Sequence, residues 1–110
     1  MNIGSLHLID NSDVIKNALP EQIEIALEAV GLQAEGYAKL KCPVDTSRLR
    51  NSITHATAKR EKAVYIGTNV EYAPYVEMGT VKTKAQPFLG PAITNHISQY
   101  EQIVEQTLKN

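Results

Sequence analysis

The chain has 110 residues, of which 43% are hydrophobic, and its formal net charge at pH 7 is -1. This length allows one domain with a modest core, so we expect a single domain over residues 1–110. The near-neutral balance gives no global argument for a nucleic-acid-binding or membrane-binding protein, and the single cysteine, Cys42, excludes an internal disulfide and a cysteine-rich zinc site.

The beginning of the chain gives the weakest structural signal. Apolar residues in the first twelve positions follow neither a helical nor a strand period, so we expect residues 1–12 to be flexible, with room for local docking. This segment lacks the basic start and the apolar run of a signal peptide, which favours a soluble protein kept inside the cell. A short helix capped by Asp10, Ser12 or Asp13 is predicted to reach Leu19, where Pro20 interrupts it.

A long helix is predicted from Pro20 to about Lys41. Proline fits the first turn of a helix, and apolar residues then recur at three- and four-residue spacing. This stripe consists of Ile23, Leu27, Val30, Ala34 and either Tyr37 or Ala38. Gly31 and Gly36 each cost about 1 kcal/mol relative to Ala inside a helix, so they indicate either a close approach by another element or a bend.

A structural turn is predicted after the long helix. Pro43 restricts the residue before it and stops the helix. Asp45 or Thr46 can then cap a short helical turn that runs from Arg48 to Asn51. We therefore assign turn and cap roles to Pro43, Asp45, Thr46 and Arg48.

A β-hairpin is predicted next. Residues 53–58 and 63–68 are rich in Thr, Val, Ile and Tyr, and a charged tip over residues 59–62 separates them. Because side chains alternate along a strand, Val64 and Ile66 should face the long helix and Tyr65 should face away.

The last part of the chain is predicted to be helical around a polar connection. A short helix is expected from Tyr72 to Met78, with Gly79 as its terminator. Residues 80–87 are polar and cationic, which predicts a mobile loop or an edge strand. A final helix should begin near Pro91 and continue almost to the end of the chain.

These elements predict an α+β fold, in which the long helix and the C-terminal helix pack on a small antiparallel sheet. An isolated hairpin is rarely stable, so a third strand is needed. The candidates are residues 3–9, residues 80–87 and a strand from a neighbouring subunit.

The charges are unevenly distributed along the chain. Residues 10–35 carry six acidic side chains against one basic, whereas residues 36–62 carry seven basic against two acidic. Solvated charges around a small domain explain this pattern, and acidic-on-basic packing of subunits is the alternative.

No set of polar residues forms a strong catalytic motif. His7, His55 and His96 lie on different predicted elements without a neighbouring ligand, so we interpret them as surface residues. Cys42 has no base near it in sequence and is interpreted as an incidental thiol. A metal-dependent nuclease would need carboxylates and lysines drawn together by folding, and the available set has only generic spacing. That set is Asp45, Glu71, Glu77, Lys82 and Lys84.

Two binding surfaces are suggested by composition. Arg48 and Arg50, with Lys39 and Lys41, would contact DNA weakly in a channel, or would form a solvated or salt-bridged face. The segment from Tyr72 to Met78 has more tyrosine, valine and methionine than a short helix needs for its own burial, which indicates an interface with another subunit or partner. The alternative is that Tyr72 and Val76 simply fill the core over the hairpin. We assign to this interface Tyr72, Tyr75, Glu77, Met78, Lys82 and Lys84.

Three blocks of the sequence together resemble a known family. The first contains Pro43-Val44-Asp45-Thr46, Arg48-Leu49 and Ser52-Ile53, with Ser47 in place of the usual glycine. The second runs from Tyr72 to Thr80, with Met78 where an aromatic residue is common. The third is Gln86-Pro87-Phe88-Leu89, followed by Gly90 where arginine is frequent. Residues 20–100 are in this way similar to the small neck proteins of long-tailed bacteriophages and prophages, a minor tail or tail-completion family that joins head to tail.

This resemblance implies a structural protein that needs no chemistry. Its partners would be copies of itself, arranged as a ring on a template, and other phage neck or tail proteins, with at most weak contact to packaged DNA. It implies no cofactor, metal, membrane or small-molecule substrate. Its place would be the host cytoplasm during assembly and then the head–tail junction of the virion. The alternatives are a phage DNA-binding accessory protein and a small metal-dependent nuclease.

Overall fold

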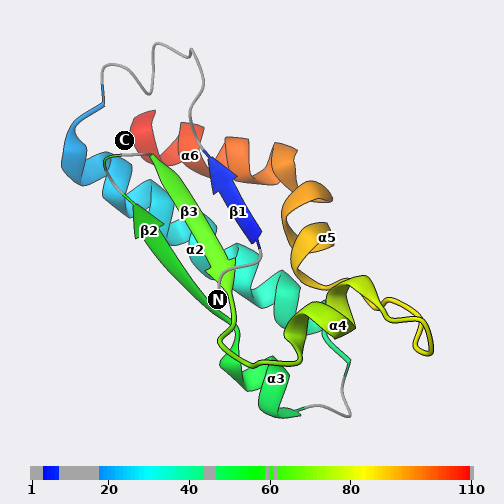
Figure 1. Cartoon of the computed structure of the whole chain (residues 1–110). Helices are drawn as coiled ribbons and strands as arrows, with labels where there is room; N and C mark the ends of the chain where they lie inside the picture. Colours follow the sequence, from blue (N-terminus) through cyan, green and yellow to red (C-terminus); the bar gives the residue numbers. More distant parts are fainter. Residues whose placement is uncertain (1–3, 8–17, 44–46, 59, 61, 110) are drawn as a thin grey trace.

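The computed structural model describes residues 4–7, 18–43, 47–58, 60 and 62–109 (Figure 1). Most of the predicted short helix before Pro20, its caps, and the predicted caps Asp45 and Thr46 lie outside these residues. Leu19, the predicted end of that helix, is extended, with φ of -69° and ψ of 146°. The elements in chain order are β1 (Gly4–His7), α2 (Pro20–Lys41), α3 (Ser47–Ser52), β2 (Thr54–Ala58), β3 (Ala63–Gly67), α4 (Ala73–Met78), α5 (Leu89–Thr94) and α6 (Ile97–Lys109).

The three described strands form an antiparallel sheet in the order β1-β3-β2. The predicted hairpin is present, with Ala58 opposite Ala63 and Thr54 opposite Gly67. The third strand is β1, which pairs along β3 with Gly4 opposite Ile66 and His7 opposite Ala63. Residues 4–7 of the N-terminal segment therefore complete the sheet, and residues 80–87 form a loop.

Helix α2 has the bounds that its sequence predicts, and it packs against the sheet on one side. Pro20 occupies its first turn, and the Gln22 side chain accepts a hydrogen bond from the Leu19 amide, 3.3 Å away. The buried face contains Ala26, Leu27, Val30, Gly31, Ala34 and Ala38. Val64 and Ile66 are buried, as predicted, while Tyr65 is half-buried. The predicted α+β fold is confirmed.

The C-terminal helix predicted from Pro91 is instead two helices, α5 and α6, with a break at Asn95 and His96. The Tyr100 hydroxyl donates a hydrogen bond to the Ala92 carbonyl. In a continuous helix this carbonyl would instead accept from the amide of residue 96. The His96 amide points to the Ile93 carbonyl, 3.4 Å away. The His96 ring stacks on Tyr37 of α2, with centroids 3.6 Å apart. Two of these contacts are local, and the stack on Tyr37 joins residues distant in sequence. Together they hold the chain where it turns between the two helices.

The core lies between α2, the sheet and the last two helices, and it is mostly aliphatic. Its largest fully buried side chains include Tyr100, Phe88, Leu27 and Leu49. Burial raises the pKa of Tyr100 to about 12, so its hydroxyl stays protonated and can donate at any ordinary pH. Among the described residues, none of the helices combines the length and the apolar character needed to cross a membrane.

Candidate functional site

Glu77, near the end of α4, binds the backbone at the start of α5. Its Oε1 accepts hydrogen bonds from the Phe88 and Leu89 amides, both at 2.9 Å, and its Oε2 accepts one from the Gly90 amide at 3.1 Å. These amides have no partner within their own helix turn. The structure thus places Glu77 in a structural cap, whereas the sequence suggested an interface.

The loop of residues 80–87 leaves α4 through a tight, hydrogen-bonded turn. Gly79 has a φ of 78°, and a Cβ on it would lie 2.7 Å from the Ala85 backbone nitrogen, so glycine is required here. The Thr80 amide donates to the Thr83 carbonyl at 2.8 Å, and the Gln86 amide donates to the Val76 carbonyl at 2.8 Å. The loop is therefore held at both ends by backbone contacts, and it is not an edge strand.

Large apolar side chains and two lysines are exposed on α4 and this loop. Tyr75 is 61% exposed, Met78 is 71% exposed, and Val81 is fully exposed. We call this surface the α4 tip, and it consists of Tyr75, Met78, Val81, Lys82 and Lys84. The sequence also assigned Tyr72 and Glu77 to this interface, but neither belongs to the α4 tip. Tyr72 is half-buried and packs against the core. The α4 tip projects from one end of the molecule, beyond the sheet (Figure 1).

Arg48, assigned by sequence to a turn or to a DNA channel, is paired with Glu71. Its Nη2 lies 3.3 Å from Glu71 Oε2, and its Nη1 lies 3.4 Å from Oε1. Its guanidinium carbon lies 5.7 Å from the centroid of the Tyr72 ring. The pKa of the Glu71 carboxyl is lowered, chiefly by a hydrogen bond from its own backbone and in addition by the hydrogen bond and positive charge of Arg48. Arg48 thus joins α3 to the segment before α4, which favours the structural role.

The other residues of the predicted turn and channel lie on α2, just after it, and on α3. Pro43 is half-buried two residues after the end of α2, and Arg50 is half-buried on α3. Lys39 forms an ion pair with Glu35 one helical turn before it, at 3.2 Å. One charge of the basic region, that of Lys39, is therefore balanced within the chain.

His55 on β2 forms a charged cluster with α2 that the sequence did not reveal. Its Nδ1 lies 2.9 Å from Glu35 Oε1, and its Nε2 lies 2.7 Å from Glu28 Oε1. Both nitrogens can donate only when the ring is protonated. Burial lowers the pKa of His55, but the hydrogen bonds to Glu35 and Glu28 outweigh burial and raise it. The pKa of Glu35 is lowered, because its contacts with His55 and Lys39 outweigh burial.

The available sequence signal for this cluster is Gly31. A Cβ on Gly31 would lie 2.5 Å from Cδ2 of His55, so the glycine allows the strand side chain to lie against α2. His55 is thus a structural residue and not a simple surface residue. Nothing in the local sequence pattern of β2 distinguishes a structural histidine from a surface histidine.

The carboxylates of the hypothetical nuclease set are committed to separate partners. Glu71 binds Arg48, and Glu77 binds backbone amides, while Asp45 lies outside the described residues. In the described part of the chain, His, Cys, Asp and Glu side chains form no group of three or more suited to holding a metal ion. Cys42 is buried.

Comparison with known proteins provides an independent observation. A family model described as Bacteriophage HK97-gp10, putative tail-component, matches residues 7–79 of this chain. The matched region contains the first sequence block and all but the last residue of the second, and it ends before the exposed loop. No curated protein and no solved structure matches the chain significantly.

Proposed function

Because this chain belongs to the HK97-gp10-like family of bacteriophage tail components, we propose that it completes the tail end or the head–tail junction of a long-tailed phage or prophage. It acts as a subunit of a ring that contacts other neck or tail proteins, and it catalyses no reaction. It assembles in the host cytoplasm and remains at the head–tail junction of the virion.

The observation that carries this proposal is the family match over residues 7–79. The α4 tip supports it: this surface begins inside the matched region, at Tyr75 and Met78, and continues beyond it to Lys84. Tyrosine gives a large contact area at a low cost in side-chain entropy, and both tyrosine and methionine are common in protein interfaces. The turn between Thr80 and Thr83 and the Glu77 cap hold this surface in place before a partner arrives. A preformed surface loses less conformational entropy on binding.

The mechanism is mass action combined with geometry. Subunits that associate weakly in solution form a ring only when a finished tail end or a connector holds several of them close together. The template thus raises the effective concentration and prevents rings from forming before tails are complete. Any contact with the packaged DNA is weak, because Arg48 is already paired with Glu71.

Complementation tests the proposal directly. The gene is deleted from its phage, the lysate is examined by electron microscopy, and the purified protein is added back before plaques are counted. Filled heads separate from finished tails, with plaques restored by the protein, are the expected result.

Normal, infectious particles without the protein would overturn the joining role. The two remaining hypotheses would then be tested in turn. A DNA-binding accessory would show an affinity that falls steeply with salt, and a nuclease would show turnover that depends on a divalent metal.

A further inference from the structure

Two lysines of the α4 tip carry charges that no described part of the chain neutralises. Lys82 and Lys84 are exposed, and neither forms an ion pair with a described residue. The turn that carries them is fixed, because the Thr80 hydroxyl accepts hydrogen bonds from the Lys82 amide at 3.2 Å and from the Thr83 amide at 3.0 Å. The loop thus presents two positive charges at one end of the molecule before a partner binds (Figure 1).

The acidic side chains near the α4 tip are already bound. Glu77 accepts hydrogen bonds from three amides at the start of α5, and Glu71 is paired with Arg48. From Met78 to Tyr100 the sequence contains no acidic residue. The charge of the tip therefore matches a partner that itself supplies carboxylates.

The centre of the α4 tip is apolar. Tyr75 and Met78 are three residues apart on α4, which places them on the same side of the helix, and they are 61% and 71% exposed. Val81 follows them and is fully exposed. A DNA phosphate backbone would attract the lysines, but it would give these three side chains no apolar surface to contact. An apolar centre with a charged rim is instead the pattern of a protein interface.

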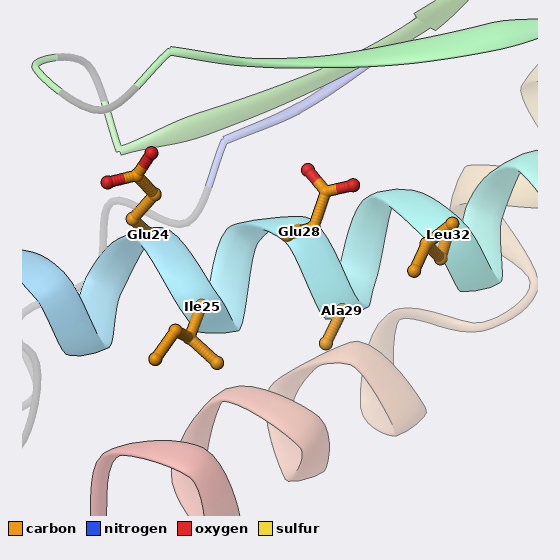
Figure 2. Close-up of a pocket in the computed structure, with 5 residues that line it drawn as sticks. All are labelled: Glu24, Ile25, Glu28, Ala29 and Leu32. Carbon is orange, nitrogen blue, oxygen red and sulfur yellow. The ribbon is translucent and has the colours of Figure 1, made fainter.

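A second copy of this chain does not present the matching surface in its described part. It has an apolar depression on α2, lined by Glu24, Ile25, Glu28, Ala29 and Leu32. Glu28 is bound to His55, and Glu24 has an interaction of its own within the chain. Figure 2 shows both carboxylates on the side of the strands, whereas Ile25 and Ala29 point away from them. The glutamates of this depression are therefore not available to two lysines.

The other carboxylates of a second copy do not change this result. Among the described residues, only Glu21 and Glu101 have a carboxylate with no described partner. Glu21 lies in the first turn of α2, and Glu101 lies on α6, which begins beside Tyr37 near the other end of α2. No single described site of a second copy thus combines two free carboxylates with the depression, and the charge match favours a different protein.

We propose that the α4 tip docks onto a different phage protein, at a shallow apolar pocket bordered by acidic side chains. Tyr75, Met78 and Val81 fill the pocket, and Lys82 and Lys84 form ion pairs with its border. The charges orient the tip and speed its encounter with the partner, while the apolar centre excludes water from the contact. This inference rests on the proposed function and adds to it the chemistry of the partner.

Binding to parts of the virion tests the docking surface. Tails and filled heads are purified from lysates of the gene-deleted phage, and the labelled full-length protein is sedimented with each of them. We expect binding to one of the two particles. Lys82→Gln combined with Lys84→Gln should weaken this binding about tenfold, because two ion pairs at the rim are lost. Arginine at both positions should recover most of the affinity.

The matched control removes two cations from the opposite end of the sheet. Arg60→Gln combined with Lys62→Gln changes the net charge equally, in the loop between β2 and β3, whereas α4 follows the other end of β3. This variant should bind the particles as tightly as the wild type does. Val81→Ser, which keeps both lysines, should weaken binding about tenfold, because a valine side chain no longer enters the pocket.

Several results would overturn the proposal. Equal binding by the wild type and by the double glutamine variant would mean that the lysines meet no acidic border. Unchanged binding of Val81→Ser would eliminate the apolar pocket, and binding of the wild type to neither particle would eliminate the partner. If a short DNA duplex bound the wild type as tightly as the particle does, and lost affinity with the double glutamine variant, the partner would be DNA.

The outcome is separable from that of the proposed function. If the double glutamine variant binds the particle normally and restores plaques, the joining role stands and the acidic pocket is wrong. If the deletion leaves infectious particles intact, those particles replace the separate tails and heads in the binding assay. Binding to them that depends on the lysines would keep the docking surface, although the joining role would be lost.

Discussion

Glu77 shows how one carboxylate fixes the position of a surface. Its three hydrogen bonds to the amides of residues 88–90 tie α4 to α5 across the loop that carries Val81. Bonds from backbone amides to a carboxylate are stronger than neutral ones, and amides left without a partner cost additional free energy. Glu77 therefore fixes the position of the α4 tip relative to α5, and it does not belong to the contact surface of the tip.

We expect Glu77→Gln to lower the free energy of unfolding by about 1.5–3 kcal/mol. Glutamine removes the charge and turns an N–H group toward one of the three amides. Urea denaturation measures the change, with Glu101→Gln at an exposed position of α6 as the matched control. Equal stability of the two variants would show that the cap adds nothing to the fold.

His55 makes the stability of the protein depend on pH. Because its pKa is raised above 6.5, its contribution is complete below about pH 6.5 and disappears as the pH rises through the raised value. Because the pKa of Glu35 is lowered from 4.5, its contribution is present above about pH 4.5 and disappears as the pH falls further. The cluster therefore contributes most between these two limits.

We expect His55→Gln to reduce the free energy of unfolding by about 1–2 kcal/mol near pH 5.5, and by clearly less above pH 8. Chemical denaturation of the wild type and of His55→Gln across this pH range gives the difference in free energy of unfolding. Contributions from titratable groups that are unaffected by the substitution cancel in this difference. A difference that stays constant with pH would mean that His55 is not held as a charged residue.

At the scale of the helix, Gly31 and Gly36 have opposite meanings. A Cβ on Gly31 would meet the His55 ring, whereas a Cβ on Gly36 would have no heavy atom within 4 Å. The first glycine permits the close approach of β2, which is one of the two explanations that the sequence left open. The second is exposed and has no packing reason to be glycine.

We expect Gly36→Ala to raise the free energy of unfolding by up to about 1 kcal/mol, because alanine orders a helix at lower entropic cost. Gly31→Ala should lower it by about 1–3 kcal/mol, because the His55 ring must leave its two carboxylates. The urea midpoints of the two variants, compared at an unchanged denaturant slope, check both signs. Stabilisation by Gly31→Ala would contradict the packing argument.

At the scale of the whole molecule, the exposed apolar surfaces are small and lie far apart. Each offers only a few large side chains, which is less than a permanent interface requires. We therefore expect the purified protein to sediment as a monomer or as a weak, concentration-dependent oligomer, and to form a ring when tails are supplied. A stable large ring formed by the protein alone would count against templated assembly.

The exposed side chains of α4 provide a separate prediction for joining. Tyr75→Ser combined with Met78→Ser should leave the melting temperature nearly unchanged, because both side chains are exposed. The same protein should fail to restore plaques in the complementation assay. Full rescue by this variant would remove Tyr75 and Met78 from the interface, and marked unfolding would assign them to the core.

Local patterns were sufficient for most of the elements. The bounds of α2 follow from Pro20, from the apolar spacing and from Pro43, and the hairpin follows from strand-forming residues around a charged tip. These signals act over a few residues, so they are visible without a partner. The surplus of apolar residues around Tyr75 likewise indicated an exposed surface before its geometry was known.

Tertiary structure alone decided which distant groups meet. It placed residues 4–7 beside β3, turned Glu77 toward the amides of residues 88–90, and seated His55 between two glutamates of α2. It also broke the last helix where the Tyr100 hydroxyl takes the Ala92 carbonyl. The sequence by itself determined α2, the hairpin and the short helix α4, because periodicity and capping are local. Partners far apart in the chain are chosen by packing, which no local pattern contains.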